Sequence, residues 1–119
     1  MSVNREDFGT EFRVTAGTTK TLELTIIDPD TGQAKSLSDT GVYATGVVKI
    51  YEPDGTLKGT AMTVNFTDRS NGVITFTISG TDQATNANAG NWIGEVEFSN
   101  TTPVKIDQQK FNMVIVESY

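Results

Sequence analysis

The chain has 119 residues, the size of a single domain, and carries a net charge of -6 from nine basic and fifteen acidic side chains. Cysteine and histidine are both absent, so disulfides, thiolate nucleophiles, imidazole bases and zinc sites built from these residues are excluded. The basic residues are scattered singly and do not form the cluster that phosphate neutralisation requires, so we expect no nucleic-acid partner.

The apolar residues alternate with polar ones in most of the chain. Threonine occurs 19 times, and β-branched residues favour strands because they pack well on a pleated surface. Period-two alternation predicts strands that bury one face, as in antiparallel sheets. The predicted strands, about seven in number, are Glu11–Thr15, Thr21–Ile27, Val42–Tyr51, Thr60–Thr67, Val73–Ser79, Asn91–Phe98 and Gln109–Val116.

Turn-forming residues separate these strands. Asp28–Gly32 and Glu52–Gly55 each combine Pro, Asp and Gly, which together favour a tight turn. The dipeptide Asn71-Gly72 lies between two alternating segments and predicts a hairpin. It is also the site in the chain most prone to slow deamidation.

The polar segment Thr81–Gly90 predicts a longer connection with one helical turn over Asp82–Thr85, capped by Thr81. About seven short strands with turns between them predict an all-β fold, an immunoglobulin-like antiparallel β-sandwich, as a single domain over residues 8–119. A small closed barrel is the alternative. Residues 1–7 lack an apolar anchor and predict a flexible arm that is disordered in isolation, which is either a frayed terminus or a segment that becomes ordered on a neighbouring subunit.

Three aspartates have part of the spacing of a calcium-binding loop. Asp28, Asp30 and Asp39 occupy its first, third and twelfth positions, but Gln33 stands where the loop requires glycine. An Asp-rich turn is the expected structure, and we predict no metal site.

Glu95 and Glu97 are the best candidates for a catalytic pair, because they share one face of a predicted strand about 7 Å apart. A general acid requires a desolvated carboxyl group, whereas a regularly alternating polar face is normally hydrated. We therefore expect a solvated strand face, no catalytic residue, no cofactor and no enzymatic activity.

The aromatic residues bear on carbohydrate binding. Trp92 lies on the apolar side of its strand and is expected in the core. Tyr43 and Tyr51 are eight residues apart, about 26 Å along a strand, too far to form one sugar-binding platform. With Val47 they form a partly apolar stripe, which is either a protein contact or part of a second buried face.

The last predicted strand is apolar on both faces because Val114 and Val116 alternate with the core positions. This pattern indicates either a central strand or contact with another molecule. The chain start is polar and no apolar stretch approaches the roughly 20 residues that span a bilayer, so we expect no signal peptide, no membrane partner and folding in a cytoplasm.

Read in order, seven features resemble one family. They are the strand TLELTIID, an Asp/Gly turn, a Ser-Leu-Ser element around Leu37, the strand end KIYEPDGT, and the segments NGVITFTIS, AGNWIGEVEF and FNMVIV. Over about Glu11–Val116 the chain is similar to the N-terminal immunoglobulin-like domain of tailed-phage baseplate upper proteins. The matching positions are core and turn residues, so the resemblance transfers no binding residue.

The resemblance implies a non-enzymatic structural component of a tailed-phage virion, in the tail or baseplate. Such a protein folds in the host cytoplasm and assembles in multiple copies with other virion proteins. In the family the domain usually precedes a helical or adapter region, so a free-standing domain would equally fit a capsid decoration or cement protein of the phage head. A carbohydrate- or cell-surface-binding module is a further alternative.

Overall fold

The computed structural model describes residues 10–100 and 105–118, in which there are eight strands, two short 3-10 helices and no α-helix. In chain order the elements are β1 (Glu11–Thr15), β2 (Lys20–Thr25), β3 (Thr45–Tyr51), β4 (Leu57–Thr63), β5 (Asn65–Asp68), η1 (Arg69–Asn71), β6 (Val73–Ile78), η2 (Asn86–Asn88), β7 (Gly90–Ser99) and β8 (Lys105–Val116). The predicted arm over residues 1–7 lies outside the described part of the chain.

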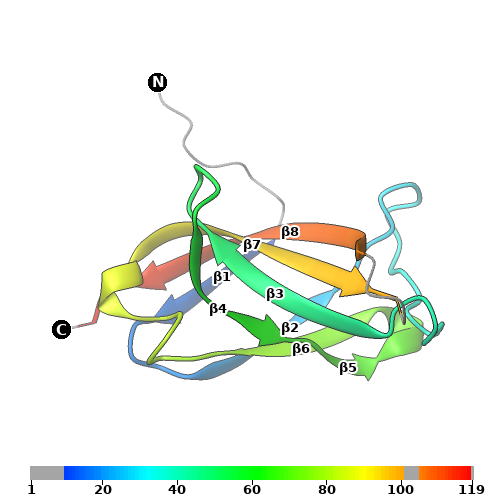
Figure 1. Cartoon of the computed structure of the whole chain (residues 1–119), viewed down its shortest axis with the longest axis horizontal. Helices are drawn as coiled ribbons and strands as arrows, with labels where there is room; N and C mark the ends of the chain where they lie inside the picture. Colours follow the sequence, from blue (N-terminus) through cyan, green and yellow to red (C-terminus); the bar gives the residue numbers. More distant parts are fainter. Residues whose placement is uncertain (1–9, 101–104, 119) are drawn as a thin grey trace.

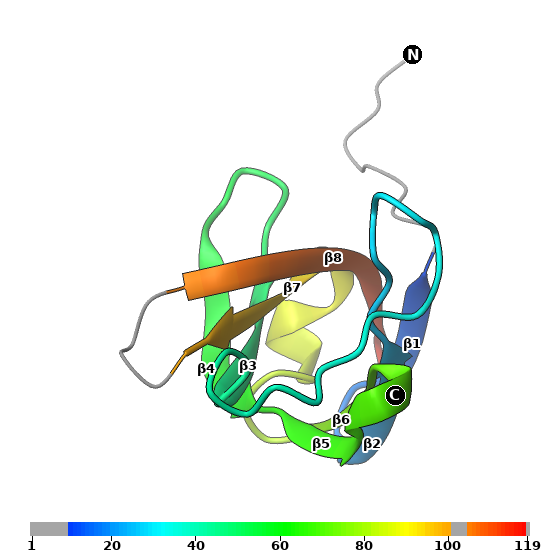
Figure 2. The same ribbon diagram turned by 90° about the vertical axis from the view of Figure 1, so that its right-hand side faces the viewer.

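Two sheets pack face to face as a sandwich (Figure 1, Figure 2). The larger sheet has the order β1-β8-β7-β3-β4 and the smaller one has the order β2-β6-β5. If β4 is counted as an extra edge strand, β2, β6 and β5 take the places of strands B, E and D of an immunoglobulin domain, and β3, β7 and β8 those of C, F and G. The predicted all-β immunoglobulin-like sandwich is confirmed, with eight strands and with one parallel pair, β1 and β8.

The eighth strand arises because the predicted strand Thr60–Thr67 divides between the two sheets. Val64 is the crossing point: it is buried, and its N–H donates to the Gly46 carbonyl at 3.0 Å. Met62 before it and Phe66 after it both face the shared core. The alternation therefore continues through the crossing, and the pattern carries no sign of the change of sheet.

The core lies between the sheets and is centred on three fully buried aromatic side chains, Phe76, Phe98 and Phe111. Phe12 closes one side, with its ring edge-on to both Phe76 and Phe111. Trp92 is 7% exposed, so its predicted core position is confirmed.

The β5–β6 hairpin predicted from Asn71-Gly72 is present, with η1 between its strands. Gly72 has φ 70°, a left-handed conformation that favours glycine. The predicted helical turn capped by Thr81 is wrong in position, because the Thr81 hydroxyl bonds to Ser79 and the 3-10 helix starts only at Asn86.

A long connection without a named strand joins β2 to β3. Arg69 holds it in place from η1: its guanidinium donates to the Leu37 carbonyl at 3.0 Å and to the Tyr43 carbonyl at 2.9 Å. The same guanidinium lies over the Phe66 ring, 3.8 Å from the centroid. One side chain thus holds this connection at two points, the buried Leu37 in its interior and Tyr43 near its end.

Candidate functional site

The outer face of the five-stranded sheet, turned away from the three-stranded sheet, is the candidate contact surface. Alternation places Val48 and Ile50 of β3 in the core, so Val47, Lys49 and Tyr51 point outward. Residues that pair directly across two strands share a face of the sheet. The register of β4, β7 and β8 therefore identifies which of their side chains also point outward.

Five apolar side chains on this face form a group that we call the outer apolar band. Its members come from four strands and are Leu57, Tyr51, Ile93, Val114 and Val116. Leu57 pairs with Tyr51, which pairs with Ile93 on its other side. Leu57 is 47% exposed and Val116 is 40% exposed, whereas Tyr51 and Ile93 are half-buried. The band lies toward the end of the sandwich that carries the β3–β4 hairpin and the C-terminus (Figure 1).

A row of charged side chains borders the band. Lys49 pairs with Glu95, which pairs with Lys110 on its other side. The Lys49 ammonium lies 3.1 Å from the Glu97 carboxylate, and this interaction raises the pKa of Lys49 above its ordinary value. The charged row is one pleat period, about 7 Å, from Tyr51 and Ile93, so apolar and charged groups are adjacent on one face.

Four of the five residues predicted to make protein contacts lie on this face, namely Val47, Tyr51, Val114 and Val116. Val47 is beyond the charged row, beside Glu97. Val114 is 9% exposed, and β8 lies between β1 and β7, so its central position accounts for its apolar character.

Tyr43 does not belong to the stripe that the sequence predicted. The N–H groups of Val42 and Tyr43 both donate to the Asp39 carbonyl, which forms a turn, and the strand begins only at Thr45. The Tyr43 ring is buried and lies edge-on to Phe98, with the ring centroids 5.6 Å apart. The prediction that Tyr43 shares an outward-facing stripe with Val47 and Tyr51 is wrong, because the alternation does not extend through this turn.

Sequence reasoning missed Leu57 and Ile93. Ile93 has the opposite parity to Trp92 in an otherwise alternating strand, which is the same signal that singled out Val114. Leu57 stands directly after the turn at Glu52–Gly55, and its place on the outer face depends on the hairpin register with Tyr51. The position of Leu57 on the outer face could have been predicted only by assigning which residues pair across that hairpin.

The predicted carboxylate pair, Glu95 and Glu97, lies on the outer face as ordinary strand residues. A neighbouring ammonium such as that of Lys49 favours an ionised carboxylate, which is the opposite of what a general acid requires. The arrangement is that of a charged sheet surface.

The aspartates of the predicted turn bind their own backbone. Asp28 accepts a hydrogen bond from the Asp30 N–H at 2.9 Å, and Asp39 accepts one from the Gly41 N–H at 3.0 Å, as in Asx turns. Within residues 10–100 and 105–118, no group of three or more acidic side chains is placed to hold a metal ion. Nor does the same part of the chain include a helix long and apolar enough to cross a bilayer.

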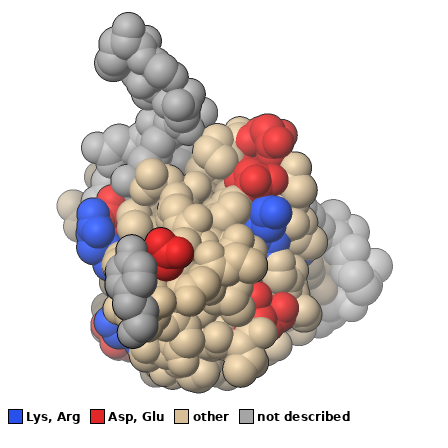
Figure 3. Space-filling view, turned by 90° about the vertical axis from the view of Figure 1, so that its left-hand side faces the viewer, with Lys and Arg blue, Asp and Glu red and all other residues tan. Residues whose placement is uncertain are grey.

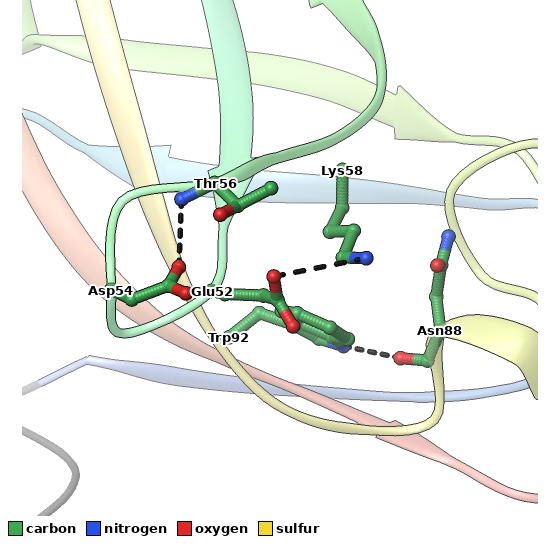
Figure 4. A network of polar contacts seen from close by, with 6 residues as sticks. All are labelled: Glu52, Asp54, Thr56, Lys58, Asn88 and Trp92. Carbon is green, nitrogen blue, oxygen red and sulfur yellow. Dashed lines mark hydrogen bonds and ion pairs between the residues drawn. The ribbon is translucent and has the colours of Figure 1, made fainter.

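A small polar network joins the β3–β4 hairpin to the loop before β7 (Figure 4). Lys58 lies over the Trp92 ring, 5.6 Å from its centroid, and 3.8 Å from the Glu52 carboxylate. The indole N–H of Trp92 donates to the Asn88 carbonyl. Trp92 is therefore covered by its neighbours and offers no free ring face as a binding platform.

The end of the sandwich that carries the C-terminus is mostly uncharged (Figure 3). Asn86 connects the loop at this end to the chain terminus, because its amide donates to the Ser118 carbonyl and accepts from the Ser118 N–H. This end adds a polar, largely uncharged margin beside the outer apolar band.

Neither a scan against protein-family models nor a search of curated proteins gives a match for this sequence.

Proposed function

We propose that this chain is a non-enzymatic assembly protein that binds another protein through the outer apolar band. The observation that carries the proposal is the exposure of large apolar side chains, Leu57 at 47% and Val116 at 40%, on the outer face of the five-stranded sheet. Large apolar side chains that are exposed together on one face of a folded domain favour an interaction surface.

The composition of the face supports a protein partner. Protein interfaces have an apolar centre with a charged, hydrated rim, and the band and the charged row have this arrangement. The band extends across four strands, about 14 Å, so a standard interface of roughly 800 Å² per partner would reach beyond the band. The charged row and the neighbouring Glu97, which lies 3.1 Å from Lys49, are therefore part of the proposed contact and give it orientation.

The assembly that we propose is the virion of a tailed phage, with the chain in the tail or baseplate. Support for this comes from the resemblance of the strands and turns to the immunoglobulin-like domain of baseplate upper proteins. The chain would fold in the host cytoplasm and then occupy many equivalent positions beside other virion proteins. A decoration or cement protein of the head is the second candidate, since the same face would serve it equally.

A carbohydrate-binding module has less support. Such modules display aromatic rings on an exposed face, whereas Trp92 is 7% exposed and Tyr43 is part of the core. Tyr51 is the remaining tyrosine of the predicted stripe, and it is half-buried between Leu57 and Ile93.

Quantitative mass spectrometry of purified phage particles tests the proposal. We expect peptides of this chain in intact particles at a fixed ratio to the major structural proteins. Separation of heads from tails before digestion distinguishes the tail location from the head location. Absence of the chain from particles that are produced by cells that express it would refute the virion assignment.

A further inference from the structure

The turn between β5 and β6 contains the dipeptide Asn71-Gly72, whose chemistry the proposed function does not use. In an Asn-Gly sequence the glycine nitrogen forms a bond to the asparagine side-chain carbon, and the side-chain amide leaves as ammonia. Solvent water then opens the resulting succinimide ring to aspartate or isoaspartate. The reaction needs a free glycine N–H and a side-chain amide that can rotate toward its own backbone.

The attacking nitrogen is restrained in the folded protein. The Gly72 N–H donates to the Arg69 carbonyl at 3.2 Å, which closes η1, and the Gly72 carbonyl accepts from the Ile26 N–H at 2.8 Å. Gly72 is buried, with φ 70° and ψ 22°. Both of its backbone groups are therefore engaged in hydrogen bonds.

The leaving group is restrained as well. The side-chain amide of Asn71 donates to a carboxylate oxygen of Asp68 at 2.8 Å. The other Asp68 oxygen accepts from the Ser70 hydroxyl at 3.1 Å, so this carboxylate holds two side chains of the turn. Ring closure would have to break the Asn71–Asp68 bond and move Asn71 out of the 3-10 conformation.

We infer that Asn71 is a latent modification site: deamidation is blocked in the folded turn and proceeds only when the β5–β6 turn opens. In such a regime the observed rate is the intrinsic rate multiplied by the fraction of molecules in which the segment is open.

Either reaction product replaces the Asn71 amide that donates to Asp68 with a carboxylate, which repels the Asp68 carboxylate. Isoaspartate also lengthens the backbone of residue 71 by one methylene, next to Gly72. A Cβ atom at Gly72 would lie 2.4 Å from the Lys35 carbonyl oxygen and 3.0 Å from that of Ile26, so the backbone has little room to shift on that side. Deamidation thus opposes closure of the turn and leaves a covalent record of opening.

The test compares deamidation of the intact chain in native buffer and in concentrated urea at the same mildly alkaline pH. Peptide mapping of the Asn71 peptide measures the mass increase and the isoaspartate content over time. We expect at least about a tenfold slower reaction in the folded protein, because opening of a structured segment is a minor population. Equal rates in the two conditions would overturn the inference.

A substitution separates the role of the Asp68 carboxylate from that of overall folding. Asp68→Ala is expected to accelerate deamidation in native buffer and to leave the rate in urea unchanged. Asp54→Ala, which removes a carboxylate from the β3–β4 turn, is the matched control and is expected to leave both rates unchanged. Asp68→Ala protein that remains folded and reacts at the wild-type rate would contradict the assigned restraint.

The stability of the product is tested with the modified chain itself. Deamidated protein, separated from unmodified protein by ion exchange, is expected to unfold at a lower temperature, because the turn also positions Arg69. An unchanged unfolding temperature would contradict the conclusion that the product opposes closure of the turn.

Discussion

Lys58 lies over the indole ring of Trp92, with its ammonium nitrogen 5.6 Å from the ring centroid. The contact couples the β3–β4 hairpin, which also carries the proposed contact residue Leu57, to the β7 strand of the same sheet. Lys58 also lies near Glu52, at 3.8 Å, in a position where solvent screens the pair.

Replacing Lys58 with methionine keeps much of the aliphatic stem and removes the charge. We expect a loss of at most about 1 kcal/mol in the free energy of unfolding, since cation–π and exposed ion-pair contributions are each of that order. Urea unfolding followed by the fluorescence of the single tryptophan measures it. Lys20→Met, at an exposed position in β2, is the control and is expected to have no effect; equal losses for both variants would contradict the account.

Arg69 is expected to be much less tolerant of substitution. Arg69→Lys keeps the charge but loses the planar group that contacts two carbonyls and the Phe66 ring at once. We expect a loss of about 2–3 kcal/mol, because carbonyl groups in the β2–β3 connection lose their donor. Arg13→Lys, at an exposed position beside Glu11, is the matched control and should change stability by less than about 0.5 kcal/mol.

Gly94 sets the distance between β7 and the aromatic core. A Cβ atom added there would lie 2.2 Å from the Phe111 ring. Gly94→Ala is therefore expected to destabilise the fold by about 1–3 kcal/mol through overpacking. Gly41→Ala, whose nearest contact would be 3.4 Å from the Asp39 carboxylate, is the control. Partial rescue of Gly94→Ala by Phe111→Leu would identify the clash as the cause, and absence of rescue would argue against it.

Acid sensitivity follows from the β5–β6 turn. Hydrogen bonds from the side chains of Asn71 and Ser70 lower the pKa of Asp68 below its ordinary value of 3.8. A group whose pKa is lower in the folded state stabilises the fold above its unfolded pKa and loses this contribution as the pH falls through the folded value. We expect unfolding free energy to fall less steeply below pH 3.8 in Asp68→Asn than in the wild type. Asp30→Asn, in another turn, is the control; parallel pH profiles for wild type and Asp68→Asn would contradict the assignment.

Much of the fold could be predicted from the sequence because most strands bury one face and expose the other to solvent. The alternation identified the buried positions of β2, β6 and β7, including Trp92. It could not show that Thr60–Thr67 crosses between sheets at Val64, since both sheets bury the same parity toward one core. Nor could it show the parallel pairing of β1 with β8, which is a long-range choice.

The candidate site was predicted only in part, and for a related reason. The alternation of apolar and polar residues singled out Val47, Tyr51 and Val116. The register of the strands places these three side chains on the same face of the sheet. Tyr43 was misplaced because it lies in a turn that starts at Asp39, and the strand begins only at Thr45. The outer apolar band becomes visible only when register aligns Leu57, Tyr51 and Ile93 across three strands.

The most direct test of the proposed contact is competition between chains for places in the particle. Cells would express equal amounts of wild-type chain and a Leu57→Glu, Val116→Glu double variant, and mass spectrometry would give their ratio in purified particles. Ile27→Glu is the matched control, because Ile27 is 41% exposed and lies outside the band. We predict at least about a tenfold depletion of the double variant, since two charges in an interface centre cost more than about 1.4 kcal/mol, and an unchanged ratio for Ile27→Glu. Incorporation of the folded double variant at the wild-type level would contradict the assignment of this face as the assembly contact.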